Sequence, residues 1–203
     1  TVIFRWFNLI ETGKTLLEHC LHTDWNPEVA REEIKKQPKY VTGGYIIKTP
    51  DGMDKVDGVI WCVNQIWPQR EQLADKIRSN NLRGSWELFM QFPYLGAFMS
   101  YELVTDLRHT KLLREADDIF TWANAGPGAM RGLNRIHGRD LNFKSRKHDF
   151  NAEMYELLQT ASDYTIPDFL PRLEMRDIEH SLCEFDKYER VRNGEGAPRG
   201  RYP

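Results

Sequence analysis

Apolar residues recur every three or four positions through most of the chain, which is the spacing of helices that bury one face. The first such stretch runs from Phe4 to Leu21 and lies on either side of Gly13, so it predicts a first helix that is broken. Further helices are predicted at residues 59–79, 86–92, 95–107, 116–123, 130–136, 150–164 and 175–188. The pattern therefore indicates an all-α fold.

Two stretches differ from this pattern. Asn26 and Pro27 precede several acids, which predicts a short polar helix that ends at about Lys36. Between Tyr40 and Gly58 the helical period is lost, and residues 45–47 followed by a Pro-Asp-Gly turn predict a loop or at most a minor β-hairpin. No internal repeat or linker divides the chain, so we expect one helical domain over residues 1–192 and a flexible basic tail over 193–203.

Composition narrows the class of protein. The 203 residues are 40% hydrophobic and 12% aromatic, which excludes a disordered tail, and a mean hydropathy of -0.61 without a long apolar run excludes a membrane span. Three scattered cysteines cannot close a disulfide framework, and the first residues do not form a signal segment. We therefore expect a globular protein of a reducing compartment, the cytoplasm.

Charge is nearly balanced over the whole chain but is unevenly distributed. The net charge of -2 and a pI near 6.3 argue at first against a nucleic-acid partner. Residues 131–148, however, carry a net charge of +5 and residues 187–203 carry +3, which leaves about -10 on the rest. A solvated face is the usual explanation of such a run, yet local basic segments also suit contact with phosphates.

The turn Gly126-Pro127-Gly128 lies directly before the first basic run. If one helix ends there and another begins, the free backbone amides of the second helix point outward and can bind phosphate, as in a helix-hairpin-helix. The alternative is a tight turn between two packed helices. The candidate DNA-binding residues are Gly126, Pro127, Gly128, Arg131, Arg135, Arg139, Lys144, Arg146 and Lys147.

Two shorter motifs do not support a nucleotide or a metal. Gly13-Lys14-Thr15 resembles the end of a phosphate-binding loop, but Asn8 stands where that motif requires its first glycine. The group His19, Cys20 and His22 has no second pair of ligands at zinc spacing. We therefore expect neither a metal nor a cofactor.

Acidic residues supply the candidate catalytic chemistry. Glu102 and Asp106 lie four positions apart in a largely apolar predicted helix, where two like charges cost a few tenths of a kcal/mol unless a cation or a catalytic role uses them. Neutralisation by Arg108 or Lys111 is the alternative.

The last predicted helix carries a second group of this kind. Its core stripe is predicted to be Ile178, Leu182 and Phe185. Its other face combines possible acids, bases and phosphate-binding groups, although an ordinary salt-bridged surface looks similar. These residues are His180, Glu184, Lys187 and Tyr188.

Four segments in order resemble the α-glutamyl/putrescinyl thymine pyrophosphorylase family, which shares its helical domain with phage 5-hydroxymethyluracil DNA kinases. The resemblance covers nearly the whole chain. The segments are residues 4–8 (FRWFN), 92–102 (FPYLGAFMSYE), 126–135 (from GPGA to Arg135) and 178–188 (IEHSLCEFDKY).

The resemblance implies a DNA-glycosylase-like helical fold and a role in thymine hypermodification of phage DNA, in the host cytoplasm. An amine or amino acid displaces pyrophosphate from a 5-hydroxymethyl group in that chemistry, so DNA and a small amine are the expected partners. Without a phosphate loop, the chain resembles the transferases and not the kinase.

The residue types in the chain suit that reaction. The departing pyrophosphate needs cations, and a carboxylate must take a proton from the incoming amine. Arg5, Arg131 and Lys187 are the candidates for holding pyrophosphate. The carboxylates Glu102, Asp106 and Glu184 are the candidates for the base or for amine recognition.

Two other activities remain open. In a helix-hairpin-helix glycosylase an aspartate about twenty residues beyond the hairpin assists cleavage of the base-sugar bond, and Asp149 stands 21 residues after Gly128. An aspartate that caps a helix needs no catalytic role, however. A non-enzymatic DNA-binding module is the third possibility. Such a module needs no cluster of carboxylates, so finding the candidate carboxylates close together would argue against it.

Overall fold

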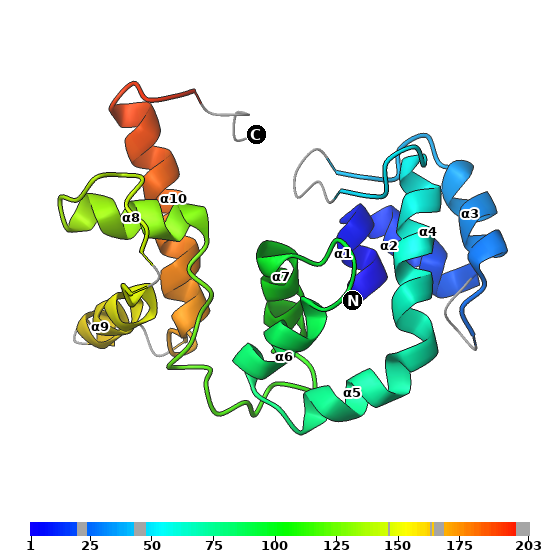
Figure 1. The fold of residues 1–203 in the computed structure, drawn as a ribbon, viewed down its shortest axis with the longest axis horizontal. Helices are drawn as coiled ribbons and strands as arrows, with labels where there is room; N and C mark the ends of the chain where they lie inside the picture. Colours follow the sequence, from blue (N-terminus) through cyan, green and yellow to red (C-terminus); the bar gives the residue numbers. More distant parts are fainter. Residues whose placement is uncertain (20–23, 43–47, 146, 163, 165–168, 198–203) are drawn as a thin grey trace. The chain divides into compact units, whose positions relative to one another are not determined.

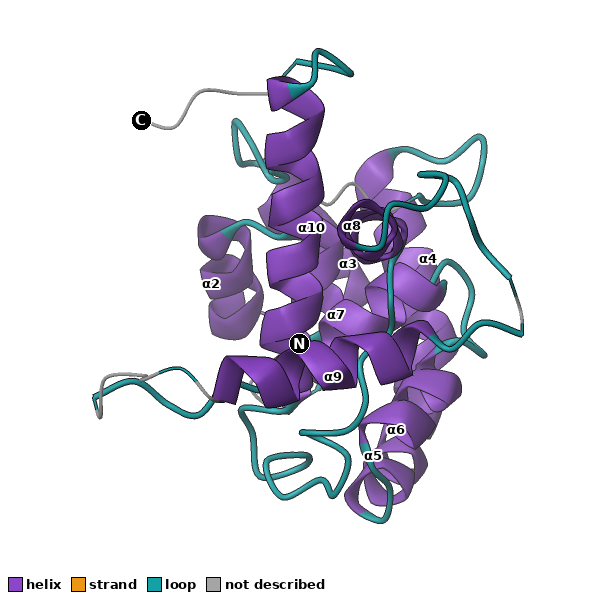
Figure 2. Cartoon of the chain, turned by 90° about the vertical axis from the view of Figure 1, so that its left-hand side faces the viewer, coloured by secondary structure: helices purple, strands orange, loops and turns teal. Residues whose placement is uncertain are grey.

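The computed structural model describes residues 1–19, 24–42, 48–145, 147–162, 164 and 169–197. Within these ranges every regular element is a helix (Figure 2), so the all-α prediction is confirmed. The chain forms two compact units, Thr1–Ala116 and Asp117–Pro203 (Figure 1), and each is described separately below. The expectation of one domain over residues 1–192 stays a prediction.

The first unit contains seven α-helices and one 3₁₀ turn among its described residues. Helix α1 packs against α2, α4 and α7, helix α3 packs against α2 and α4, and α6 packs against α7. Its core includes the fully buried side chains of Trp6, Phe7, Leu16, Ile34 and Phe89. The elements are α1 (Val2–Phe7), α2 (Ile10–His19), α3 (Pro27–Lys35), α4 (Lys55–Ile66), η1 (Trp67–Gln69), α5 (Arg70–Arg78), α6 (Leu82–Phe89) and α7 (Ala97–Leu107).

The predicted break in the first helix is present, but it lies at Asn8. This residue has φ 51, a left-handed conformation that asparagine adopts more readily than most residues, and it ends α1. Gly13 lies inside α2. A Cβ at Gly13 would stand 2.8 Å from Cδ2 of Phe4, so this glycine permits the close approach of α1 and α2.

The second unit contains α8 (Pro127–Ile136), α9 (Phe150–Ser162) and α10 (Met175–Arg192). Helices α8 and α10 make its most extensive contact and cross closely (Figure 1). The crossing depends on Gly132, where a Cβ would lie 2.6 Å from the carbonyl oxygen of Leu182. Buried side chains of all three helices, among them Leu133, Met154 and Leu182, form the core.

The prediction of a helix at residues 116–123 is wrong. The N–H groups of Thr121 and Trp122 both donate to the carbonyl oxygen of Asp118, which makes a single turn. Asn151 of α9 then takes the neighbouring backbone groups, because it accepts from the N–H of Ala123 at 2.9 Å and donates to the carbonyl of Thr121 at 2.7 Å. A tertiary contact therefore replaces the next helical turn.

The helix predicted over residues 59–79 is divided into α4 and α5 by the 3₁₀ turn η1, and the other predicted helices are present with shifted ends. Helix α3 begins as predicted, with the Asn26 side chain accepting from the N–H groups of Glu28 and Val29. The possible hairpin strand at residues 45–47 lies outside the described residues. In the part of the chain that the structure describes, no helix has the length and apolar character required to cross a membrane.

Candidate functional site

Arg5, Glu102 and Asp106 form one cluster in the first unit. Nε and one terminal nitrogen of Arg5 donate to the two oxygens of Asp106 at 2.6 and 2.5 Å. The other terminal nitrogen donates to Oε2 of Glu102 at 2.9 Å. Arg5 of α1 and the two carboxylates of α7, all predicted from the sequence to take part in the displacement reaction, are therefore in direct contact.

The cluster forms because α7 is buried along most of its length. Glu102 is only 6% exposed, and a second carboxylate one turn away needs a cation to offset the repulsion between the two. The prediction named Arg108 or Lys111 as that cation. Arg5 is the observed partner, whereas Arg108 donates to the carbonyl of Arg114.

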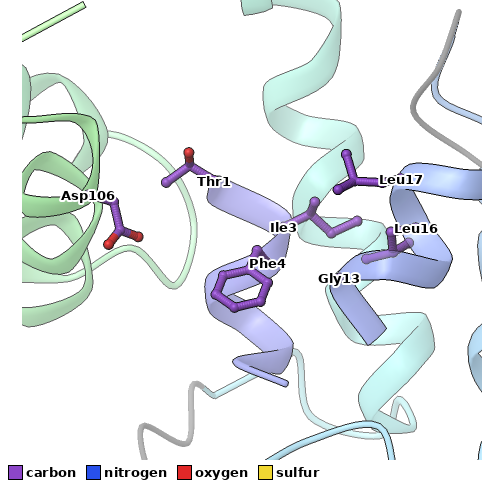
Figure 3. A pocket seen from close by; sticks show the side chains of 7 residues that line it. All are labelled: Thr1, Ile3, Phe4, Gly13, Leu16, Leu17 and Asp106. Carbon is purple, nitrogen blue, oxygen red and sulfur yellow. The ribbon is translucent and has the colours of Figure 1, made fainter. Parts of the chain in front are cut away.

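A cavity of about 390 Å³ lies beside Asp106. Figure 3 shows Asp106 on one side of Phe4 and Leu16 with Leu17 on the other. The side chain of Asp106 is 32% exposed, so it remains accessible to a small ligand while it is paired with Arg5. The cavity is lined by Thr1, Ile3, Phe4, Gly13, Leu16, Leu17 and Asp106.

Neither of the two short N-terminal motifs forms a nucleotide or metal site among the described residues. Gly13, Lys14 and Thr15 all lie within α2, and the Thr15 hydroxyl donates to the carbonyl of Glu11, so these residues do not form a phosphate-binding loop. His19 ends α2, while Cys20 and His22 lie outside the described residues. Within the described ranges no three His, Cys, Asp or Glu residues are grouped as a metal site would require.

The start of α8 is in contact with α10. The N–H of Gly126 donates to Oε1 of the buried Glu179 at 3.3 Å. A Cβ on Gly128 would approach Sγ of Cys183 to 2.9 Å, so this glycine also serves packing. Residues 122–126, directly before α8, form no helix or turn, and a helix-hairpin-helix is not confirmed. The alternative, a tight turn between two packed helices, is not observed either, because no helix precedes Gly126 among the described residues of this unit.

The arginines that follow this turn have carboxylate partners in the same unit. Arg131 and Arg135 both donate to Asp186, which is 3% exposed, and both reach Glu195 beyond the end of α10. The two carboxylates hold the pKa of Arg135 above its usual range. These interactions tie α8 to α10, and contact of Arg131 and Arg135 with DNA stays a prediction.

Arg139 makes a second ion pair, with Glu153 of α9. Its two terminal nitrogens donate to the two carboxylate oxygens at 2.6 and 2.7 Å. Burial alone would raise the pKa of Glu153, but the hydrogen bond and charge of Arg139, with smaller contributions from His137 and His148, lower it. Arg139 thus anchors the loop after α8 to α9.

The remaining predicted site residues are exposed or undescribed. Lys144 and Lys147 are exposed in the loop before α9, and Arg146 lies outside the described residues. Lys187 pairs with Glu184 at 2.5 Å on the exposed face of α10. Asp149 accepts from the N–H of Ala152 at 3.1 Å and caps α9, which is the non-catalytic role considered for it.

Sequence reasoning missed the acids on the buried face of α10. Met175, Glu179, Leu182 and Asp186 are buried, whereas Phe185, which was assigned to the core stripe, is 36% exposed. These four residues follow helical spacing, so the buried face of α10 could have been predicted if acidic as well as apolar residues had been considered for it. The carboxylates were overlooked because their partners, Gly126, Arg131 and Arg135, lie on another helix.

Comparisons with known proteins support the shared helical domain that the sequence motifs implied, but they do not support the thymine pyrophosphorylase family itself. The family model for the helical domain of 5-hmdU DNA kinase matches residues 1–197. A 5-hmdU DNA kinase of Bacillus phage SP10 is 24% identical over 93% of this chain, and this chain spans only 33% of that protein. No solved structure matches. The chain belongs to the family of 5-hmdU DNA kinase helical domains.

Proposed function

We propose that this chain is the helical domain of an enzyme that modifies hydroxymethyluracil in DNA, and that it replaces pyrophosphate on the 5-hydroxymethyl group by an amine. Membership of the family and the similarity to a phage 5-hmdU DNA kinase support the DNA substrate. The proposal that an amine replaces pyrophosphate is supported by the ion-paired cluster of Arg5, Glu102 and Asp106, which lies beside a cavity.

The charge of the cluster favours the amine over the pyrophosphate. One guanidinium between two carboxylates leaves a net charge of -1 on the three side chains, which attracts an ammonium group and repels a polyanion. We therefore assign Arg5 to positioning the carboxylates and no longer to holding pyrophosphate. Lys187 lies in the second unit, where it pairs with Glu184, and its part in holding pyrophosphate stays a prediction.

The cavity beside Asp106 suits an amine with an alkyl chain. Its other walls include the apolar side chains of Ile3, Phe4 and Leu16, which can cover methylene groups. Each oxygen of Asp106 accepts one hydrogen bond from Arg5, and a carboxylate oxygen has room for a second donor. An ammonium at Asp106 with its alkyl chain on the apolar walls fits this arrangement.

The proposed step balances as a substitution. The bound ammonium first gives a proton to a carboxylate of the cluster, and its nitrogen lone pair then attacks the carbon attached to C5 of the base. A carbon–nitrogen bond forms as the bond between that carbon and the pyrophosphate oxygen breaks, with its electron pair leaving on pyrophosphate. The nitrogen loses a second proton to water, which gives a neutral secondary amine that protonates in solution.

DNA contact is proposed for the loop between α8 and α9. Lys144 and Lys147 are exposed there, and no ion pair involving either is found within the described ranges. Arg131, Arg135 and Arg139 are proposed as supports for this loop, since each is paired with a carboxylate. The basic run would thus divide into residues that stabilise the unit and residues that contact phosphate.

The test is an incubation of the full-length protein with DNA containing pyrophosphorylated hydroxymethyluracil and putrescine, followed by digestion to nucleosides and mass analysis. An aminated nucleoside supports the proposal. An abasic site would support the glycosylase alternative, and unchanged DNA would contradict both. A parallel reaction with unmodified hydroxymethyluracil and ATP tests the kinase activity named for the relative.

A further inference from the structure

Arg131 and Arg135 bind two carboxylates that differ in how firmly each is held. Asp186 lies within α10 and is 3% exposed, and Nε of each arginine donates to it, at 3.1 and 2.8 Å. Glu195 lies in the turn after α10, and its side chain is 32% exposed. The terminal nitrogens of the arginines donate to Glu195: those of Arg135 to both of its oxygens, and one of Arg131 to a single oxygen at 3.4 Å.

The surroundings of Glu195 have the geometry and the charge of an anion-binding site. The two N–H groups of Arg135 form a fork, which fits the oxygens of a phosphate as well as those of a carboxylate. The side chain of Arg135 is only 9% exposed and is held by Asp186, so the fork is preformed. The hydrogen bond from Arg135 and the charges of Arg135, Arg131 and Arg190 hold the pKa of Glu195 below its usual range.

The turn after α10 allows the carboxylate of Glu195 to leave the arginines without unfolding of the helix. Gly194 has φ 70, a left-handed conformation that glycine adopts without strain, and the N–H of Glu195 donates to the carbonyl of Arg190 at 2.8 Å. These interactions fix the backbone of the turn, whereas the side chain of Glu195 can rotate about its own bonds into solvent. Asp186 lacks this freedom because it is buried.

From this arrangement we infer that Arg131 and Arg135 form a binding site for a phosphate group, and that Glu195 occupies this site when no phosphate is bound. Without Glu195, the two guanidiniums and Asp186 carry a net charge of +1, which attracts an anion. The bonds to Asp186 persist in both states, so the arginines continue to tie α8 to α10.

The inference rests on the proposed function for the source of the phosphate. That reaction offers two sources, the backbone of the DNA and the leaving pyrophosphate, and both present the same oxyanion chemistry to a guanidinium fork. Because Glu195 competes from within the same chain, it lowers the apparent affinity of the site for either one.

The variant that tests this competition is Glu195→Gln, which keeps the length of the side chain and removes its charge. Glu189→Gln is the matched control, because Glu189 pairs with Arg192 near the same end of α10. Both variants remove one negative charge from the second unit. Thermal unfolding followed by circular dichroism checks that each protein is folded.

The experiment is isothermal titration calorimetry of the full-length protein with inorganic pyrophosphate and, separately, with a short DNA duplex at the same salt concentration. Glu195→Gln should bind at least one of the two about tenfold more tightly than wild type, and Glu189→Gln should match wild type. A gain for pyrophosphate alone identifies the leaving group as the ligand, and a gain for DNA alone identifies the backbone phosphate. Arg131→Gln, added to Glu195→Gln, should abolish the gain.

Equal affinities of wild type and Glu195→Gln for both ligands would overturn the inference and leave Glu195 as a structural tie between α8 and the end of α10. Arg131→Gln alone should weaken binding of the same ligand about tenfold, and wild-type affinity in this variant would overturn the site even if Glu195→Gln did not fold. Amine transfer is measured separately, so its failure would overturn the proposed function without changing these affinities.

Discussion

Arg5 and Asp106 are joined by two hydrogen bonds of 2.6 and 2.5 Å although 101 positions separate them in the chain. The contact ties α1 to α7, and through Glu102 it places a second carboxylate on the same guanidinium. Because the three charges are partly or largely buried, the cluster matters for stability as well as for the proposed reaction.

Replacement of Arg5 by methionine should destabilise the first unit by about 2 kcal/mol, because it leaves two neighbouring carboxylates without this cation. Urea unfolding followed by tryptophan fluorescence measures the change. Five of the six tryptophans lie in the first unit, so the signal reports mainly on it. Arg31→Met is the control, since Arg31 is itself more exposed than Arg5 and its partner Asp57 keeps a second cation, Lys35, so it should cost less than about 1 kcal/mol. Equal losses in the two variants would contradict the special role of Arg5.

Gly132→Ala should destabilise the second unit by about 2 kcal/mol or more. The added methyl group would lie 2.6 Å from the carbonyl oxygen of Leu182, and backbone atoms of two packed helices cannot yield cheaply. Gly96→Ala adds the same group where no atom lies within 4 Å and should be nearly neutral. Thermal unfolding by circular dichroism compares them, and a Gly132→Ala protein as stable as Gly96→Ala would refute the close crossing of α8 and α10.

The ion pair of Arg139 with Glu153 should make the second unit less stable in acid. The pKa of Glu153 is lower in the folded chain than its usual value of 4.5, so the folded state favours the charged form. This stabilisation is complete above pH 4.5 and is lost as the pH falls through the lowered pKa. Glu153→Gln should therefore show a smaller drop in Tm between pH 6 and pH 3.5 than wild type.

Glu156→Gln is the matched control for that experiment, because Glu156 is exposed on the same helix. It should keep the acid sensitivity of wild type. If Glu153→Gln retained the whole drop in Tm as well, the pair with Arg139 would not be its source.

Cys183 should be nearly unreactive while the protein is folded. Burial, together with the neighbouring Glu179 carboxylate, raises the pKa of the thiol to about 12. At pH 8 its alkylation by iodoacetamide should be on the order of a thousandfold slower than in the urea-unfolded chain. Mass spectrometry of the labelled peptide measures this rate, and labelling of Cys183 at the unfolded rate in native protein would show that the packing of α8 on α10 is wrong.

Local patterns predicted much of the fold. Asn26 with Pro27 marked the start of α3, and apolar spacing found most of the other helices. The prediction failed where a distant side chain competes for backbone groups, as Asn151 does with residues 121–123. The spacing of apolar residues cannot predict such a contact, because it contains no information on polar side chains from a distant part of the chain.

The candidate site was predicted only in part, again because local patterns do not show contacts between residues that are far apart in the sequence. The carboxylates of α7 were visible as a like-charged pair in an apolar helix, but their partner Arg5 lies on another helix. The charge pattern predicts phosphate contact for residues 131–148, and the structure adds that Asp186, Glu195 and Glu153 pair with three of the arginines in this run. Net charge along the sequence does not show which bases are paired across helices.

The most direct test of the account is the KM for putrescine of Asp106→Asn in the pyrophosphate displacement assay. The variant keeps the shape of the side chain and removes the charge proposed to hold the ammonium. We expect KM for the amine to rise about tenfold with a smaller change in kcat. Asp57→Asn, which removes a carboxylate from the pair with Arg31 in the same unit, should leave both constants unchanged. An unchanged KM in Asp106→Asn would contradict the assignment of the cluster to the amine.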